Sequence, residues 1–250
     1  MTYTSALRLV PGLLLAVSAA AATPPASIDT LATSAGRVVV HPVAHASFVL
    51  LWEGTVLAVD PVGGGARYAA FPRPDVVLIT HHHGDHFDLD TVRGVAREGT
   101  VVIAPPDVAE SLASLAAIAL RNGQSHTIGD LVVRAVPAYN RTPERAGFHP
   151  QGRDNGYLLE RDGARIYVSG DTEDVPEMAQ VGPVDAAFLC LNLPWTMSVE
   201  QAAAAVALIR PRVLYPYHYR NRDGTQADLD QLRRLVPDTA GVEIRRLAWY

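Results

Sequence analysis

Short apolar runs separated by polar breaks follow one another in the early part of the chain. Runs of this length, rich in valine, leucine and phenylalanine, are typical of strands, and they occupy residues 37–40, 47–51 and 55–59. Trp52-Glu53-Gly54, between the last two runs, predicts a hairpin turn. The pattern therefore predicts a group of neighbouring strands at the start of the folded region.

Farther along, strand-like runs alternate with segments of helical spacing, and this arrangement occurs twice. Pro105-Pro106 opens one helical segment, because proline is favoured in the first helical turn. Ser198, with Gln201 three residues later, has the pattern of a capping box at the start of another. The predicted strands are 75–79, 100–103, 131–136, 156–160, 165–169, 186–191, 213–215 and 242–247, and the predicted helices are 89–97, 105–120, 198–209 and 227–235.

The first residues have the features of a secretory signal peptide. Arg8 precedes a short apolar core at 9–17, and small residues fill 18–22. The apolar core is too short to span a bilayer comfortably, and an uncleaved membrane anchor is the alternative interpretation. We therefore expect a periplasmic or secreted protein without stable membrane association, built from a signal peptide at 1–22, a flexible leader at 23–36 and one folded domain at 37–250.

The charge and the residue composition exclude several classes of function. The formal net charge is −5, and removal of Arg8 with the signal peptide would make it −6, which argues against a nucleic acid as partner. All 21 basic residues are arginine, so no lysine can act as a nucleophile or form a Schiff base. The single cysteine, Cys190, lies in the apolar run 186–191 and is predicted to be a small buried hydrophobic residue.

A cluster of candidate metal ligands follows the predicted strand 75–79. The segment Thr80-His81-His82-His83-Gly84-Asp85-His86 contains the pattern His-x-His-x-Asp-His, and imidazole and carboxylate groups bind zinc, iron and manganese. His81 and His83 can point the same way, because side chains of an extended segment repeat every two residues. Asp85 and His86 can turn past the glycine toward a second ion. The alternative is a histidine-rich surface loop without a metal.

Three more candidates lie at the ends of predicted strands. Asp171 follows the strand 165–169, where a carboxylate can bridge two cations. His218 follows the strand 213–215 and suits the second ion. Asp60 ends another strand and can orient a ligating histidine. A turn-forming role is the alternative for both aspartates, and an ordinary core or surface position is the alternative for His218.

With these residues assembled, the chain resembles the metallo-β-lactamase superfamily of metallo-hydrolases. The resemblance covers nearly all of the chain from Val38 onward and is carried by His45-Ala46-Ser47-Phe48, Val59-Asp60-Pro61, 80–86, Gly170-Asp171-Thr172 and His218. Within the superfamily the chain looks closest to the single-domain branch related to ascorbate-phosphate lactonase, on the segments 137–140, 148–150 and 156–157. The resemblance implies an α+β fold, a four-layer αββα sandwich with a metal site between the edges of its two sheets.

The resemblance also implies two divalent metal ions, with zinc as first choice and manganese or iron as the other candidates. It assigns His81 and His83 to the first ion, Asp85, His86 and His218 to the second, and Asp171 to a bridge between them, with Asp60 and His45 in contact with the ligands. Many superfamily members have a histidine where this chain has Asn140. Asn140 itself, or His149 nine residues further on, is therefore expected to complete the first site, unless Asn140 is a turn residue and His149 a loop residue.

In such a centre a water between two cations loses a proton near neutral pH and attacks a carbonyl or phosphorus centre, with Asp85 as a further proton acceptor. The resemblance thus predicts hydrolysis of a small ester, lactone or phosphodiester without a covalent intermediate. Two alternatives stay open, a periplasmic protein that binds metal without catalysis and a di-iron oxidoreductase on the same fold. No oligomeric state is predicted.

Overall fold

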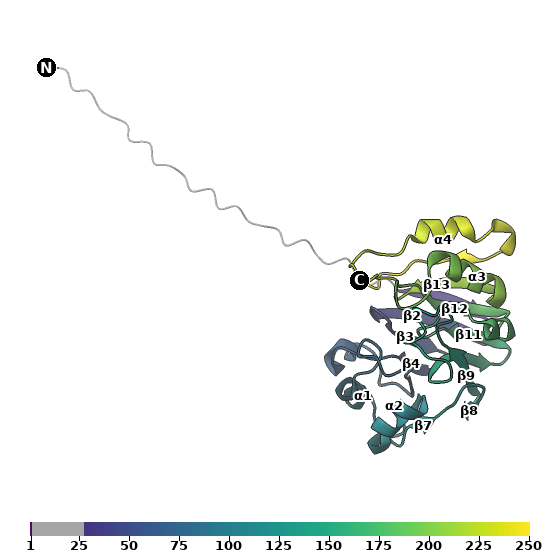
Figure 1. The fold of residues 1–250 in the computed structure, drawn as a ribbon. Coiled ribbons are helices and arrows are strands. Elements are labelled where there is room, and N and C mark those ends of the chain that lie inside the picture. The colour runs from purple at the N-terminus through teal and green to yellow at the C-terminus, as the bar shows by residue number, and fades with distance from the viewer. Residues whose placement is uncertain (2–27) are drawn as a thin grey trace.

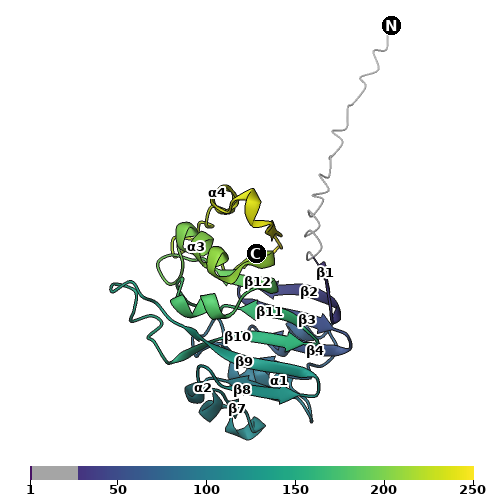
Figure 2. The same cartoon turned by 90° about the vertical axis from the view of Figure 1, so that its right-hand side faces the viewer.

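The computed structural model describes Met1 and residues 28–250, which form two β-sheets with helices on their outer faces (Figures 1 and 2). The first sheet has the strand order β1-β2-β3-β4-β5-β6-β7. Strands β1 to β4 pair antiparallel, and β4 to β7 pair parallel. These strands are Asp29–Thr33, Gly36–Ala44, Ser47–Trp52, Thr55–Val59, Val76–Leu78, Val101–Ala104 and Ile118–Ala119.

The second sheet repeats this topology, in the order β14-β13-β12-β11-β10-β9-β8. Strands β8 to β11 pair antiparallel, and β11 to β14 pair parallel. The arrangement of strands and helices that occurs twice along the sequence therefore forms one sheet at each occurrence. The strands are Ser125–Ile128, Leu131–Ala138, Asp154–Arg161, Ala164–Val168, Val184–Cys190, Pro211–Tyr217 and Glu243–Ile244.

Helices cover the outer face of each sheet, which confirms the predicted αββα sandwich (Figure 2). Helices α1 (Leu89–Val95) and α2 (Pro106–Ser111) pack on the first sheet through a hydrophobic cluster of their own. Helix α3 (Val199–Ile209) packs on β12 of the second sheet, and α4 (Leu229–Leu235) packs against α3. Four 3-10 turns are also present in the described part, at Gly65–Tyr68, Ala113–Leu115, Pro176–Gln180 and Asp238–Ala240.

Strand β3 shows why its residues form a continuous apolar run. Phe48 and Leu50 point into the core between the sheets, whereas Val49 packs with the residues of α1 and α2. Both faces of the strand are therefore buried, as is usual when helices and a second sheet cover a sheet on its two sides. Phe48 stacks on Phe188 of β12 with 4.5 Å between ring centroids, which joins the two sheets at the middle of the core.

Two local predictions are confirmed. Ser198 and Gln201 form the capping box at the start of α3, each side chain bonding the other's backbone amide. Glu53 and Gly54 form the turn between β3 and β4 with φ angles of 43° and 83°, the positive values that a tight two-residue hairpin needs.

The predicted leader at 23–36 is too long, because Asp29–Thr33 forms β1 at the edge of the first sheet. Asp29 lies opposite Val40 of β2. Leu31 is the only buried residue of this strand, so the run does not stand out as apolar in the sequence. Residues 23–27 and the predicted signal peptide, apart from Met1, lie outside the described residues.

The predicted helix 105–120 is also wrong in its extent. Helix α2 ends at Ser111, and Ala116 has a left-handed φ of 51°, a conformation that a continuous right-handed helix does not contain. The chain then forms the short strand β7. Strand β8 was not predicted, because Ile128 is its one large apolar residue.

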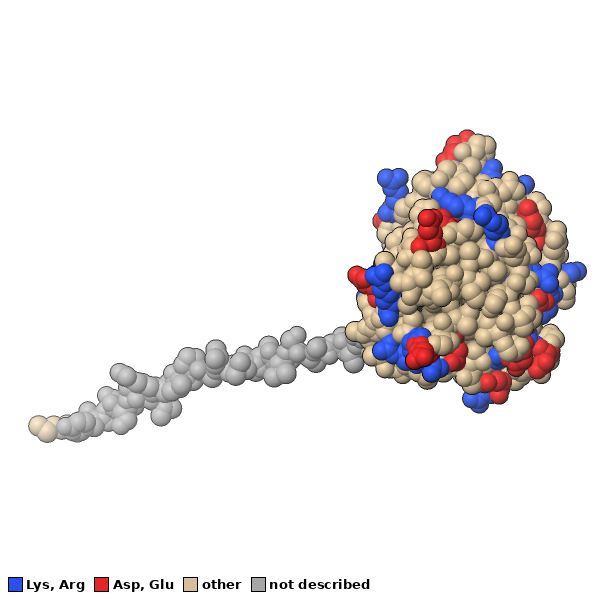
Figure 3. Space-filling view, turned by 90° about the horizontal axis from the view of Figure 1, so that it is seen from below, with Lys and Arg blue, Asp and Glu red and all other residues tan. Residues whose placement is uncertain are grey.

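Acidic and arginine side chains are mixed on the face shown in Figure 3, and neither sign forms a continuous patch there. Within the part of the chain that the structure describes, no helix has the length and apolar character needed to cross a bilayer.

Candidate metal centre

Thr80 fixes the start of the histidine loop between the two sheets. Its amide donates to Oδ1 of Asp60 at the end of β4, over 2.7 Å. Its carbonyl accepts from the amide of Asn155 in β10 of the other sheet, over 3.0 Å. Hydrogen bonds to both sheets therefore fix the point at which the loop leaves β5.

The loop then curls, so that its histidines point to different sides. The amide of His86 donates to the carbonyl of His83 over 2.9 Å. His81 and His83 lie on one side, with 4.7 Å between ring centroids, as the two-residue repeat predicts. His82, between them, turns away and lies 3.2 Å from the carboxylate of Asp107.

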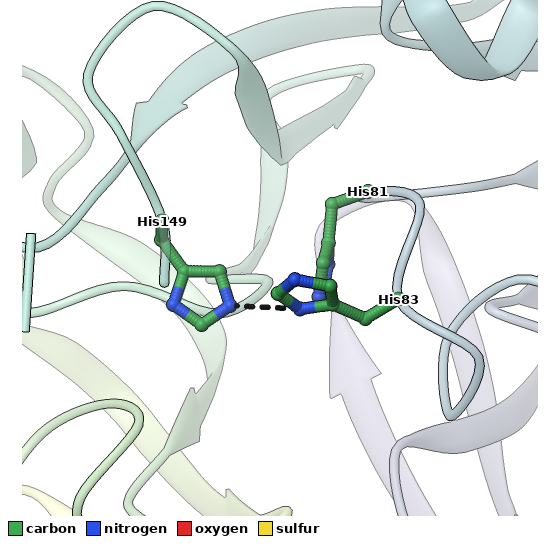
Figure 4. A group of neighbouring side chains, drawn as sticks. All are labelled: His81, His83 and His149. Carbon is green, nitrogen blue, oxygen red and sulfur yellow. Dashed lines mark hydrogen bonds between the residues drawn. The ribbon is translucent and has the colours of Figure 1, made fainter. Parts of the chain in front are cut away.

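One group of three imidazoles comes from distant parts of the chain (Figure 4). Ligand atoms of His81, His83 and His149 all lie within 4.8 Å of one another. Nε2 of His149 is 3.2 Å from Nδ1 of His83. Nδ1 of His149 lies 3.2 Å from the carbonyl oxygen of Trp195, and a carbonyl only accepts, so Nδ1 carries the hydrogen and Nε2 presents its lone pair to the group.

A second group lies beside the first. His45, Asp85 and His218 again place ligand atoms within 4.8 Å of one another. Oδ2 of Asp85 is 3.2 Å from Nε2 of His45 and 3.4 Å from Nε2 of His218. Nε2 of His86 is 3.9 Å from the same oxygen. Asp85 is thus the carboxylate of this group, and its side chain is 47 % exposed.

Asp171 lies between the two groups. Its Oδ1 is 3.4 Å from Nε2 of His86. Its Oδ2 lies 3.4 Å from Nε2 of His218, 3.5 Å from that of His149 and 4.0 Å from that of His81. One carboxylate therefore faces four imidazole nitrogens from both groups, the position that the sequence predicts for a bridging ligand.

The residues present fit a bound cation. Nε2 of His81, Nε2 of His86 and Oδ1 of Asp171 are buried and have no hydrogen-bond partner among the described residues, although the last two atoms lie 3.4 Å apart. Buried polar atoms without partners are costly and rare in folded proteins, yet these three belong to one group of neighbouring side chains. Bound divalent cations would satisfy all three, and imidazole with carboxylate is a donor set that zinc, iron and manganese accept.

Asp60, the carboxylate expected to orient a ligating histidine, contacts the ring of His86. Its Oδ2 accepts a hydrogen bond from Nδ1 of His86 over 2.7 Å and another from the hydroxyl of Thr80 over 2.7 Å. Both His86 and Asp60 are completely buried. Because Nδ1 is engaged with a carboxylate, Nε2 of His86 is directed to the centre.

Burial and the two carboxylates shift the pKa values of the histidines in opposite directions. Burial lowers the pKa of His149 to about 4 and that of His81 well below its usual value, so both are neutral at pH 7. Burial also disfavours charge on His86, but Asp171 and Asp60 outweigh it and raise the pKa of His86 to about 10. Burial alone would raise the pKa of Asp171, yet the neighbouring imidazoles hold it well below its usual value.

Asn140 lies next to the centre but its amide nitrogen is engaged elsewhere. Nδ2 donates to the carbonyls of Arg145 and Trp195, over 3.0 and 2.6 Å, and its backbone amide donates to the carbonyl of His149 over 2.8 Å. Its Oδ1 is buried and has no hydrogen-bond partner within residues 28–250. Asn140 and His149 thus share the Trp195 carbonyl, and of the two it is His149 that stands among the other imidazoles.

The centre lies at the bottom of a pocket of about 410 Å³. The pocket is also lined by five residues that sequence reasoning did not place in the site: Phe148, Asn192, Trp195, Arg220 and Asn221. Phe148 belongs to the segment 148–150 that carries the resemblance, and nothing in the local pattern of the other four marks them. Cys190 does not line the pocket. It is buried as predicted, and burial raises its pKa to about 12, so it is not a nucleophile.

The chain matches the β-lactamase superfamily domain over residues 40–218. A UPF0173 metal-dependent hydrolase of Thermococcus kodakarensis is 33% identical over 211 residues, which cover 80% of this chain and 92% of that protein. A crystal structure of a candidate metal-dependent hydrolase from Parabacteroides distasonis has a TM-score of 0.81 and 37% identity, and the match covers 90% of this chain and 100% of that one. CmlA, a diiron β-hydroxylase from Streptomyces venezuelae, shares the fold with a TM-score of 0.66 and 22% identity, over 84% of this chain and 53% of its own.

The chain therefore belongs to the β-lactamase superfamily. Within it, the chain is a member of the UPF0173 family of metal-dependent hydrolases. The superfamily resemblance drawn from the motifs at 80–86 and 170–172 is thus confirmed.

Proposed function

We propose that this protein is a binuclear metal-dependent hydrolase of a small ester, lactone or phosphodiester. The observation that carries the proposal is the position of Asp171, whose carboxylate faces imidazoles of both groups at 3.4 to 4.0 Å. A carboxylate so placed suits two ions better than one, because nitrogens of both groups lie around it: its Oδ2 is within 4.0 Å of Nε2 of His81, His149 and His218, and its Oδ1 is 3.4 Å from Nε2 of His86.

His149, rather than Asn140, completes the first set in this proposal. The residues that would hold the two ions are His81, His83 and His149 for one, Asp85, His86 and His218 for the other, and Asp171 for both, while His45 contacts Asp85. Such an imidazole-rich set favours zinc, with manganese or iron as alternatives. When bound, the ions would supply Lewis acidity and activate a water molecule.

Asp85 and the composition of the pocket lining indicate how the attacking water would be oriented. Burial alone would raise the pKa of Asp85, but hydrogen bonds from His218 and His45 hold it far below its usual range, so the carboxylate stays ionised. Being half-exposed to the pocket, it can accept a hydrogen bond from the attacking water and orient it. The pocket lining contains no serine, threonine or cysteine among the described residues, which favours direct attack by water over a covalent intermediate.

The test combines metal analysis of the purified protein with a panel of phosphodiesters, esters and lactones. We expect two equivalents of a divalent metal and hydrolysis of at least one class. Asp171→Ala should lose both metal and turnover, by several orders of magnitude for turnover, whereas Asp90→Ala, on the exposed start of α1, should keep both. Iron without hydrolysis would point to oxidoreductase chemistry, and tight metal without any turnover to a binding protein.

A further inference from the structure

Among the residues that the structure describes, Arg220 is the one arginine that lines the pocket of the metal centre. Two amide side chains line the same pocket, but their oxygens already accept hydrogen bonds from the protein itself. Oδ1 of Asn192 accepts from the hydroxyl of Thr196 over 2.5 Å, and Oδ1 of Asn221 accepts from the amide of Leu193 over 2.9 Å. Of these three side chains Arg220 alone is charged, and its guanidinium is available to bind a ligand.

Contacts with Tyr250 fix the position of Arg220. The guanidinium carbon lies 4.0 Å from the centre of the Tyr250 ring, a distance at which an aromatic face attracts a cation. The backbone amide of Arg220 also donates to the Tyr250 hydroxyl over 3.1 Å. Stacking uses a face of the guanidinium and leaves its N–H groups, which lie in its plane, available for hydrogen bonds.

No carboxylate neutralises this guanidinium within residues 28–250. None lies within 4.0 Å of Arg220, and none accepts a hydrogen bond from its side chain. The two aspartates of the pocket, Asp85 and Asp171, instead contact imidazoles. Since the metal ions of the proposed function would add positive charge to the same pocket, its net charge favours an anionic ligand.

We propose that Arg220 binds an anionic substituent of the substrate, a carboxylate or a phosphate group that is separate from the bond being hydrolysed. The proposal rests on the hydrolase function and narrows its substrate class. Arginine matches two oxygens of such a group with two parallel N–H donors. Phe148, which is 36% exposed, and Trp195 line the same pocket and offer apolar surface to the rest of the molecule.

Binding of three matched probes tests the proposal without requiring turnover. The probes are phenylacetate, phenyl phosphate and the neutral phenylacetamide, titrated calorimetrically into zinc-loaded protein. We expect at least one anion to bind roughly tenfold more tightly than the amide, the gain typical of a charge-assisted hydrogen bond. The anion that binds more tightly shows whether the subsite suits a carboxylate or a phosphate.

Two arginine variants decide whether Arg220 is responsible. Arg220→Met should lose the preference for the anion, and Arg222→Met should keep it, because Arg222 is also exposed in this loop but does not line the metal pocket. Equal zinc content and melting temperature in both variants confirm that each is folded.

A preference that persists in Arg220→Met would mean that the anion binds the metal ions instead, and it would overturn the proposal, as would the absence of any preference in the wild type. These outcomes are distinct from failure of the hydrolase function. If the protein binds the anion through Arg220 but hydrolyses nothing, the proposed subsite stands and the proposed hydrolase function fails.

Discussion

The buried carboxylate of Glu173 lies 2.7 Å from the guanidinium of Arg145, and this ion pair joins the strand end that carries Asp171 to the loop that carries His149. The other oxygen of Glu173 accepts hydrogen bonds from the backbone amides of residues 141 and 142, each over 2.7 Å. The position of His149 beside the other imidazoles therefore depends on a contact between two side chains that bind no metal themselves.

Arg145→Met should destabilise the protein and loosen the first metal position. The substitution leaves the Glu173 carboxylate buried without its partner, and breaking a buried pair typically costs about 3 kcal/mol or more. We expect a fall of this size in the free energy of unfolding in urea and a lower zinc content. Arg234→Met is the control, because Arg234 pairs with Asp228 at the surface, where both side chains are more than half exposed and a pair contributes little to stability. Equal losses in both variants would contradict a special role for the buried pair.

His149→Ala should lower the zinc content by one equivalent, because it removes a nitrogen from the three-imidazole group. Asn140→Ala should retain both equivalents but bind the first roughly ten- to a hundredfold more weakly, since groups that hold a ligand in place have effects of this size. Zinc stoichiometry and competition with a chelator measure the two effects. If Asn140→Ala lost an equivalent and His149→Ala did not, the assignment of the two residues would be reversed.

Asp60→Asn should weaken zinc binding by roughly ten- to a hundredfold, because an amide cannot replace the charge that Asp60 presents to Nδ1 of His86. Asp162→Asn is a matched control. Both aspartates have a φ of 44°, a left-handed conformation that asparagine tolerates, but Asp162 lies in the exposed turn between β10 and β11. Chelator competition should show normal zinc affinity in Asp162→Asn alone.

The contribution of Asp29 to stability should depend on pH. Burial raises the pKa of Asp29, but hydrogen bonds from Tyr215 and Arg245 outweigh it and lower the pKa. The carboxylate thus stabilises the folded state above its unfolded pKa of about 3.9, and this contribution is lost as the pH falls through the lower folded value. The urea midpoints of wild type and Asp29→Asn should differ near neutral pH and converge in acid. A constant difference would indicate packing rather than charge.

We propose that residues 1–22 direct export and are then removed. Expressed in a Gram-negative host, the protein should be recovered from the periplasmic fraction with an intact mass that begins near Thr23. A membrane-bound species that retains Met1 would show that the segment is an anchor.

The elements that sequence patterns predicted well are those whose signals are local. The apolar runs at 47–51 and 55–59 became β3 and β4, and the capping box at Ser198 starts α3. Strand β1 was not predicted, because it is held in place by pairing with β2 and by a hydrogen bond from Arg245, which is 216 residues away from Asp29 in the sequence. No local pattern of residues around position 29 indicates either contact.

The sequence by itself determined the candidate metal ligands in the segment 80–86 and at Asp171 and His218, and their position after predicted strands, because ligand chemistry and the two-residue repeat act within a few neighbouring residues. Only the tertiary structure decided that His149 stands among the imidazoles while Asn140 holds the Trp195 carbonyl, and that Glu173 pairs with Arg145. These contacts arise where loops from two packed sheets meet. Their geometry depends on how the sheets pack together, and no local pattern in the chain encodes that packing.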